Sequence, residues 1–243
     1  MFVYAKHALP VRTHNHNENL LYFMISIFFN AFGNALTVSL NLGSALWTAS
    51  AVNFTALTSI SLSIILIASG VLVVIINALI IGKIDWHRII GNMIFMVPFS
   101  YLIGMISTYL VAIGINELPL IVRVVLDIVG VCFISLAISI YQRVNLMLHP
   151  CDDLMQIIRF KFFKGNATVA QLVTFSPPIV ILLICWIDSH QLYAINVGTI
   201  FALLFQGTLV GVFDKTVFPT LKHQNIDHGQ ASSQSHKHHG LNV

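Results

Sequence analysis

The sequence predicts an all-α fold, a polytopic membrane helix bundle with about six transmembrane helices. Hydrophobic residues make up 57% of the 243 residues and charged residues only 9%, whereas soluble domains carry roughly 25% charged residues. The apolar residues gather in six runs, close to the length of about 20 residues that a helix needs to cross a bilayer. The Lys and Arg residues lie almost entirely in alternate segments between those runs.

The six runs divide the chain into a short tail, a membrane domain and a second tail. Residues 1–19 are polar and predict a cytoplasmic N-terminal tail, and residues 20–214 predict the membrane domain. The expected transmembrane helices span about 20–40, 59–81, 89–113, 120–140, 172–187 and 194–213. Because Pro177 and Pro178 lie inside the fifth and shortest run, we expect that helix to be kinked or broken.

The placement of basic residues predicts the orientation. If the N-terminus is inside, the outer segments are about 41–57, 115–118 and 188–193, and none of them contains Lys or Arg. Of the twelve basic residues, only Arg123 falls within a membrane run. An excess of Lys and Arg marks the cytoplasmic loops of membrane proteins. We therefore expect both termini to lie in the cytoplasm.

Two polar segments remain outside the six runs. In residues 152–164 the apolar residues fall on one helical face and the basic residues elsewhere, which predicts an amphipathic helix on the inner leaflet or dipping partly into it. An ordinary basic cytoplasmic loop is the alternative. Residues 215–243 predict a disordered cytoplasmic tail, in which His236, His238 and His239 are weak candidates for metal ligands.

The sequence contains a weak internal repeat. Asn-Leu occurs at 41–42 and again at 145–146, each time where an apolar run stops. Each unit holds three spans, and because three is odd, the second unit must be inverted relative to the first. Inverted 3+3 repeats are a recurring construction of membrane transporters. We expect helix breaks near Gly43 and Pro150, at related positions on opposite sides.

The same segments resemble a known group of proteins. Residues 41–48 are similar to a group segment A-x-LG-x-x-P-W/x-D, with Leu46 in place of Pro and Thr48 in place of Asp. Residues 146–154 look like its G-L-x-P-x-D-x-L pattern, and residues 196–207 look like a third, in which Asn196 replaces the first Gly. Over about residues 18–214 the chain resembles the YczE/YyaS/YitT group of bacterial multi-pass membrane proteins, most closely the YczE family. The resemblance implies a bacterial plasma membrane protein and implies no particular activity.

Polar residues in or beside the runs are the candidate solute-binding residues. A charge at mid-bilayer costs about 2.5–3.5 kcal/mol on insertion scales, so it usually faces protein or water. The candidates are Asn34, Asn41, Trp47, Arg123, Asp127, Asn145, Thr199 and Gln206. Arg123 and Asp127 lie four residues apart on one helix face, either as a structural ion pair or as an anion-contacting arginine with a coupling carboxylate. The uncharged candidates also fit hydrogen bonds between helices.

The chain carries none of the enzyme motifs HExxH, GxSxG or the Walker loop, so we expect neither catalysis nor a cofactor. Its basic residues do not interleave with aromatic residues, so we expect no nucleic acid partner. The expected partners are the lipid bilayer, a small solute, and a second copy or another membrane protein. We interpret the chain as a small-solute permease. The alternatives are a non-transporting regulatory or assembly protein and a solute-binding subunit of a multi-component importer.

Overall fold

A computed structural model describes residues 16–193 and 195–223. Over those residues the chain is helical and contains no strand, which confirms the all-α prediction. The helices are α1 (His16–Ser39), α2 (Leu46–Thr58), α3 (Leu62–Ile81), α4 (Trp86–Ala112), α5 (Leu120–Val144), α6 (Pro150–Lys161), α7 (Ala167–Thr174), α8 (Ser176–Ser189) and α9 (Val197–Thr216), with a 3-10 turn at Ile115–Glu117. The candidate ligands His236, His238 and His239 lie outside the described residues.

Six helices of the described chain are long and apolar enough to cross a membrane. They are α1, α3, α4, α5, the pair α7 and α8 taken together, and α9. Large apolar side chains such as Leu79 and Ile121 remain more than three quarters exposed, as expected of side chains that face lipid. The fifth span covers Ala167–Ser189 and is longer than the expected 172–187. It is broken at Phe175, and Pro177 lies in the first turn of α8, where a missing N–H costs no helical hydrogen bond.

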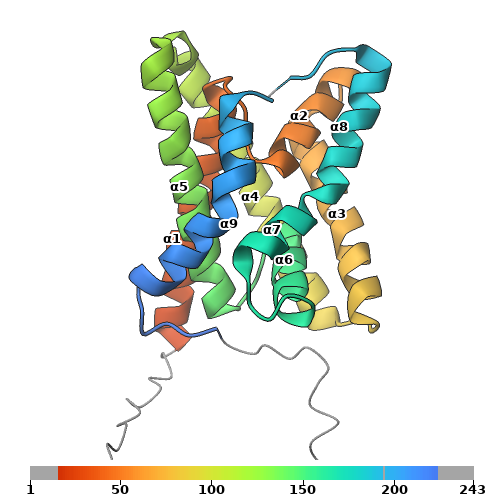
Figure 1. Ribbon diagram of the computed structural model, residues 1–243, viewed down its shortest axis with the longest axis vertical. Helices are drawn as coiled ribbons and strands as arrows, with labels where there is room; N and C mark the ends of the chain where they lie inside the picture. Colours follow the sequence, from red (N-terminus) through yellow and green to blue (C-terminus); the bar gives the residue numbers. More distant parts are fainter. Residues whose placement is uncertain (1–15, 194, 224–243) are drawn as a thin grey trace, which may run out of the picture.

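Two short segments lie deeper than expected. Residues 41–57, expected as an outer loop, contain most of the helix α2, whose buried residues include Ala49 and Asn53. Residues 152–164, expected as an amphipathic helix on the inner leaflet or dipping partly into it, overlap α6, which is buried along most of its length among other helices. Both segments are re-entrant: the chain turns back into the bundle after α1 or α5, and the short helix leaves toward the same end (Figure 1). Groups distant in sequence hydrogen-bond to some of the buried polar side chains of these segments, such as Asn53 and Asp153, and this favours their burial.

The helices form two units with matching contacts and opposite directions. Helix α1 rises and α5 descends in Figure 1, and α2 lies in the upper half of the molecule whereas α6 lies in the lower half. Packing of α1 on α4 and of α3 on α4 is matched by packing of α5 on α9 and of α7 on α9. Asn41 and Asn145 both adopt the left-handed conformation, with φ of 52° and 49°, which Asn tolerates better than most residues. These matches bear out the inverted repeat.

The two units cross at small residues and exchange their short helices. At the contact of α1 with α5, a Cβ added to Gly33 would meet the carbonyl oxygen of Gly130 at 2.7 Å. Close approach of backbones at small residues is typical of packed membrane helices. Helix α2 of the first unit packs against α8 of the second, and α6 of the second packs against α3 of the first. Each unit therefore completes the other.

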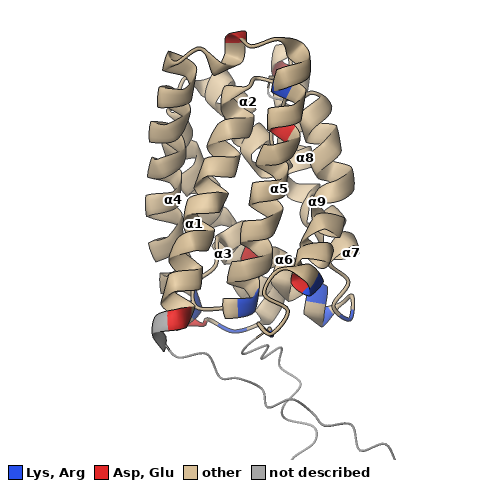
Figure 2. Cartoon of the chain, turned by 90° about the vertical axis from the view of Figure 1, so that its left-hand side faces the viewer, with Lys and Arg blue, Asp and Glu red and all other residues tan. Residues whose placement is uncertain are grey.

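Charged residues lie mainly at one end of the bundle. Figure 2 shows the Lys and Arg residues gathered at the end where α1 begins and α9 ends, with a single basic position near the opposite end. That single position is Arg123 in α5. The described chain thus has one strongly basic end and an opposite end at which acidic positions accompany the single basic one (Figure 2).

Candidate functional site

A cavity of about 50 Å³ lies between the two re-entrant segments, and 16 residues line it. The lining comes from both units: α1, α2, α3 and α4 of the first, and α5, α6, α7 and α9 of the second, with their adjoining loops. A cavity of roughly 10–15 Å³ can hold one water molecule. The cavity therefore has room for about four waters or for one small solute.

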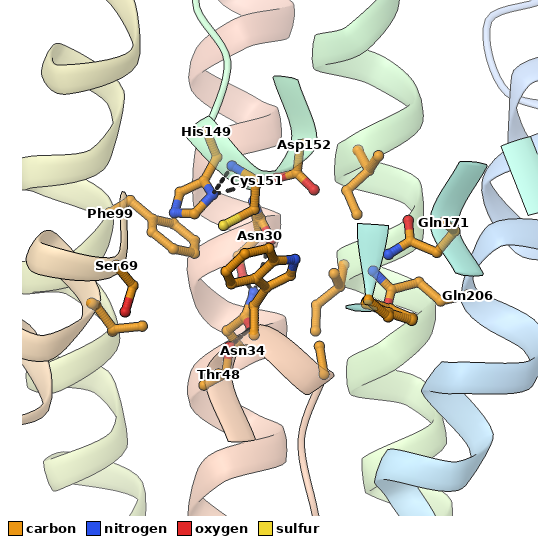
Figure 3. Close-up of a pocket in the computed structure, with 16 residues that line it drawn as sticks. Asn30, Asn34, Thr48, Ser69, Phe99, His149, Cys151, Asp152, Gln171 and Gln206 are labelled. Atoms are coloured by element: carbon orange, nitrogen blue, oxygen red, sulfur yellow. Dashed lines mark hydrogen bonds and ion pairs between the residues drawn. The ribbon is translucent and has the colours of Figure 1, made fainter. Parts of the chain in front are cut away.

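The N-terminal ends of α2 and α6 meet at this cavity. Trp47 and Thr48 come from the first turn of α2, and Cys151 and Asp152 come from the first turn of α6. Figure 3 shows His149, Cys151 and Asp152 on one side of the cavity and Thr48 on the other. Each helix N-terminus is equivalent to roughly half a positive charge. No side chain caps the start of α2, so its first N–H groups remain for other partners.

A chain of hydrogen bonds crosses the wall of the cavity on α1. Asn34 Nδ2 donates to Asn30 Oδ1 at 2.9 Å, and Thr48 Oγ1 donates to Asn34 Oδ1 at 2.9 Å. Asn30 Nδ2 donates to Tyr141 Oη at 3.2 Å. Tyr141 in turn donates to the carboxylate of Asp152 through a short hydrogen bond. The chain fixes the starts of both re-entrant helices to α1 and α5.

Asp152 is the one carboxylate among the cavity residues. Its nearest ring nitrogen is His149 Nδ1 at 3.8 Å, which already accepts a hydrogen bond from the Cys151 N–H at 3.3 Å. An imidazole nitrogen that accepts carries no proton, so in this geometry His149 supplies no positive charge. Asp152 sits in the first turn of α6, where a negative charge is favoured by the helix dipole.

Other polar atoms at the cavity have no partner. The side chains of Gln171 and Gln206 are each 3% exposed, and the Oε1 atom of each is buried without a hydrogen bond. Trp47 Nε1, on another wall, is also buried without an acceptor. Figure 3 shows Gln171 and Gln206 side by side along one flank of the cavity. An unsatisfied buried polar group costs about 1–3 kcal/mol, so these atoms favour a polar occupant.

The loop from Leu40 to Ala45 is held by residues that the sequence singled out. Arg123 donates through Nε to the Leu40 carbonyl oxygen at 2.9 Å and through a second nitrogen to the Asn41 carbonyl oxygen at 3.3 Å. The Ser44 N–H donates to Thr199 Oγ1 at 3.1 Å. Gly43 has a φ of 112° and lies so close to Thr199 that a Cβ would meet Oγ1 at 2.5 Å. Arg123 and Thr199 thus position the loop and do not line the cavity.

Asp127 does not form the ion pair with Arg123 that was one of the two interpretations. Both of its carboxylate oxygens are buried without a hydrogen bond. The carboxylate lies against the first turn of α9, where a Cβ on Gly198 would collide with Oδ2. Arg123 instead donates to the carbonyl oxygen of Leu40, the residue that directly follows the C-terminus of α1. Asp127 therefore lies beside the N-terminus of α9, in contact with Gly198.

Helix α6 is anchored to the first unit by a buried ion pair. The carboxylate of Asp153 is fully buried and meets Arg88 Nη2 at 2.7 Å and Arg88 Nε at 2.9 Å. Asn92 Nδ2 donates to the same carboxylate at 2.9 Å, and Asn77 Nδ2 donates to the Pro150 carbonyl at 3.1 Å. These contacts tie the start of α6 to α3 and α4, as expected for a helix that begins at Pro150.

The end of α6 is anchored to α9 by a second group of charges. Asp214 Oδ2 meets Arg159 Nη2 at 2.8 Å, and Asp214 Oδ1 accepts a hydrogen bond from Ser139 at 2.8 Å. Arg143, 1% exposed, donates to the Val217 carbonyl at 2.8 Å. Arg159 is 7% exposed, so it lies inside the bundle and does not face a membrane surface.

The sequence candidates divide into three places. Asn34, Trp47 and Gln206 line the central cavity. Asn41, Arg123, Asp127 and Thr199 lie around the loop that leads into α2. Asn145 lines a separate space of about 240 Å³ at the basic end, next to Lys83 and Arg88.

Sequence reasoning missed several cavity residues. His149, Asp152 and Gln171 were not among the candidates, although all three line the cavity. Asn30 could have been found, because it lies four residues before Asn34 on the same face of α1. Gln171 had no such signal, since it reaches the cavity only through the fold of α7.

Comparison with known proteins gives one family. The sequence model of a family of unknown function, DUF6198, matches residues 17–215. Because the match covers most of the chain, the protein belongs to this family. No curated protein and no solved structure matches the chain.

Proposed function

We propose that this DUF6198 protein is a small-solute permease whose solute passes through the cavity between α2 and α6. The proposal rests on one observation: two oppositely directed re-entrant helices meet at a cavity that is lined by both polar and apolar side chains, inside an apolar bundle. Membrane transporters built from inverted repeats bind solutes where the N-termini of broken helices meet near the midplane. We also propose that the chain is related to the YczE family, which residues 41–48, 146–154 and 196–207 resemble.

The proposed orientation places the basic end of the bundle in the cytoplasm of a bacterial cell, with the plasma membrane around the six spans. It is supported by the Lys and Arg residues at that end (Figure 2). Single cysteines introduced at Gly82 and at Glu117, in loops at opposite ends, would test it. In intact cells an impermeant thiol reagent should label the cysteine at 117 and spare the one at 82; the reverse pattern would contradict the orientation.

The alternative is a regulatory protein that acts through residues 152–164 and their basic side chains Arg159, Lys161 and Lys164. Arg159 is buried and bonds to Asp214 and to the Gly165 carbonyl at 2.8 Å, whereas Lys161 and Lys164 are exposed. A buried arginine in this position is better explained as an anchor for α6.

A flux measurement with a blocked cavity tests the permease. Ser69 lines the cavity from α3, and Ile64 on the same helix is 58% exposed on the outer side. In proteoliposomes, a panel of small solutes should include at least one that crosses faster than through protein-free vesicles. Ser69→Phe should abolish that flux because a phenyl ring fills the cavity, and Ile64→Phe should preserve it. Unchanged flux through folded Ser69→Phe, or no flux of any solute, would contradict the proposal.

A further inference from the structure

The central cavity has few charged groups. Asp152 contributes one carboxyl group, which accepts a hydrogen bond from Tyr141, and the N-termini of α2 and α6 each contribute a partial positive charge. No Lys or Arg is among the residues that line this cavity. The electrostatics therefore favour neither a cation nor an anion, since either would leave one charge without a counterpart.

The cavity offers hydrogen-bond donors and acceptors on different walls. Gln171 and Gln206 present carboxamides whose oxygens have no partner, on the flank formed by α7 and α9. Trp47 Nε1 and the uncapped first turn of α2 present donors on another wall. A carboxamide pairs best with a group that both donates and accepts, such as another amide or a urea.

Size and shape narrow the occupant further. The cavity of about 50 Å³ is small, which favours a compact solute. The rings of Trp47, Phe99 and Phe175 line it and provide flat apolar walls. A small planar solute can stack on such walls while its edges form hydrogen bonds.

We infer that the cavity takes a small, neutral, planar solute of the amide or urea class, held by Gln171, Gln206 and Trp47. This inference rests on the proposed permease and names its solute class. The two glutamines and the indole N–H act as solute contacts, while Asp152 opposes the partial positive charges of the two helix N-termini and is itself bonded to Tyr141.

The test compares three probes of similar size in proteoliposomes: urea, methylammonium and formate. After subtraction of the flux through protein-free vesicles, urea should cross at least about tenfold faster than either ion. An uncompensated charge or a lost hydrogen bond changes affinity by about that factor. Gln206→Leu and Gln171→Leu, which keep the volume and remove the amide, should each lower urea flux about tenfold. Trp47→Phe should also lower urea flux, because it removes the indole N–H that contacts the solute while an aromatic ring remains.

Trp186→Phe is the matched control, since Trp186 is 49% exposed on the outer side of α8, and it should leave urea flux unchanged. Faster flux of methylammonium or formate than of urea would overturn the solute class while leaving the permease in place. Flux of water without flux of urea would overturn the solute class as well. Urea flux that is unaffected in folded Gln206→Leu, Gln171→Leu and Trp47→Phe would show that the solute does not use these contacts. Absence of flux for these probes and for the whole solute panel would instead remove the permease itself.

Discussion

Loss of Arg88 should destabilise the bundle by stranding the carboxylate of Asp153. Asp153 is fully buried and Arg88 is 23% exposed, with three contacts of 2.7–2.9 Å between them. Removing one partner of a buried ion pair costs about 3–5 kcal/mol. Because Arg88 is partly solvated, we expect the lower limit, about 3 kcal/mol. For a chain of this size that corresponds to a fall in melting temperature of about 6–12 °C.

The assay is thermal unfolding of the purified protein in mild detergent, for Arg88→Met, Asp153→Asn and the double variant. An amide in place of the carboxylate carries no charge and still meets the side chains of Asn92 and Asn77. The double variant should therefore be more stable than Arg88→Met alone, by about 1–2 kcal/mol. A double variant as unstable as or less stable than Arg88→Met would refute the reasoning, because the stranded charge would then not be the cause.

Two further predictions concern close contacts between the units. Gly33→Ala should lower the free energy of unfolding by about 1–3 kcal/mol, because its Cβ would lie 2.7 Å from the Gly130 carbonyl oxygen. Gly211→Ala, with nothing within 4 Å of its Cβ, should be neutral or stabilising in the same detergent melt, and equal losses would contradict a tight crossing. Thr199→Val removes the acceptor of the buried Ser44 N–H and should speed hydrogen exchange in residues 40–45, measured by mass spectrometry. Unchanged exchange there would mean that Thr199 does not hold the loop.

The spans could be predicted because their signal is local. Each is an apolar run of sufficient length, and the bilayer sets that length. Even the break in the fifth span follows from Pro177 and Pro178, which cannot continue a helix. The inverted repeat could also be predicted, since Asn41 and Asn145 follow the ends of matching helices.

The re-entrant helices could not be placed because their signal is not local. Helix α2 has only 13 residues, too few to span a bilayer, so a length criterion assigns it to a loop. Helix α6 has the charge pattern of a surface helix, yet Asp153 and Arg159 are satisfied by Arg88 and Asp214, 65 and 55 residues away in sequence. The cavity depends on both placements, and for that reason only Asn34, Trp47 and Gln206 were found in advance.

The exchange of short helices between the units makes the order of synthesis matter. When α6 leaves the ribosome, its partner α3 is already in the membrane. Helix α2 is made early, but its partner α8 is made more than one hundred residues later. During that interval Asn53 lacks the backbone groups of Tyr193 to which it bonds in the folded chain, since chains fold from the N-terminus during synthesis. The first half of the chain therefore completes its packing only after the second half has been made, although the two halves share one architecture.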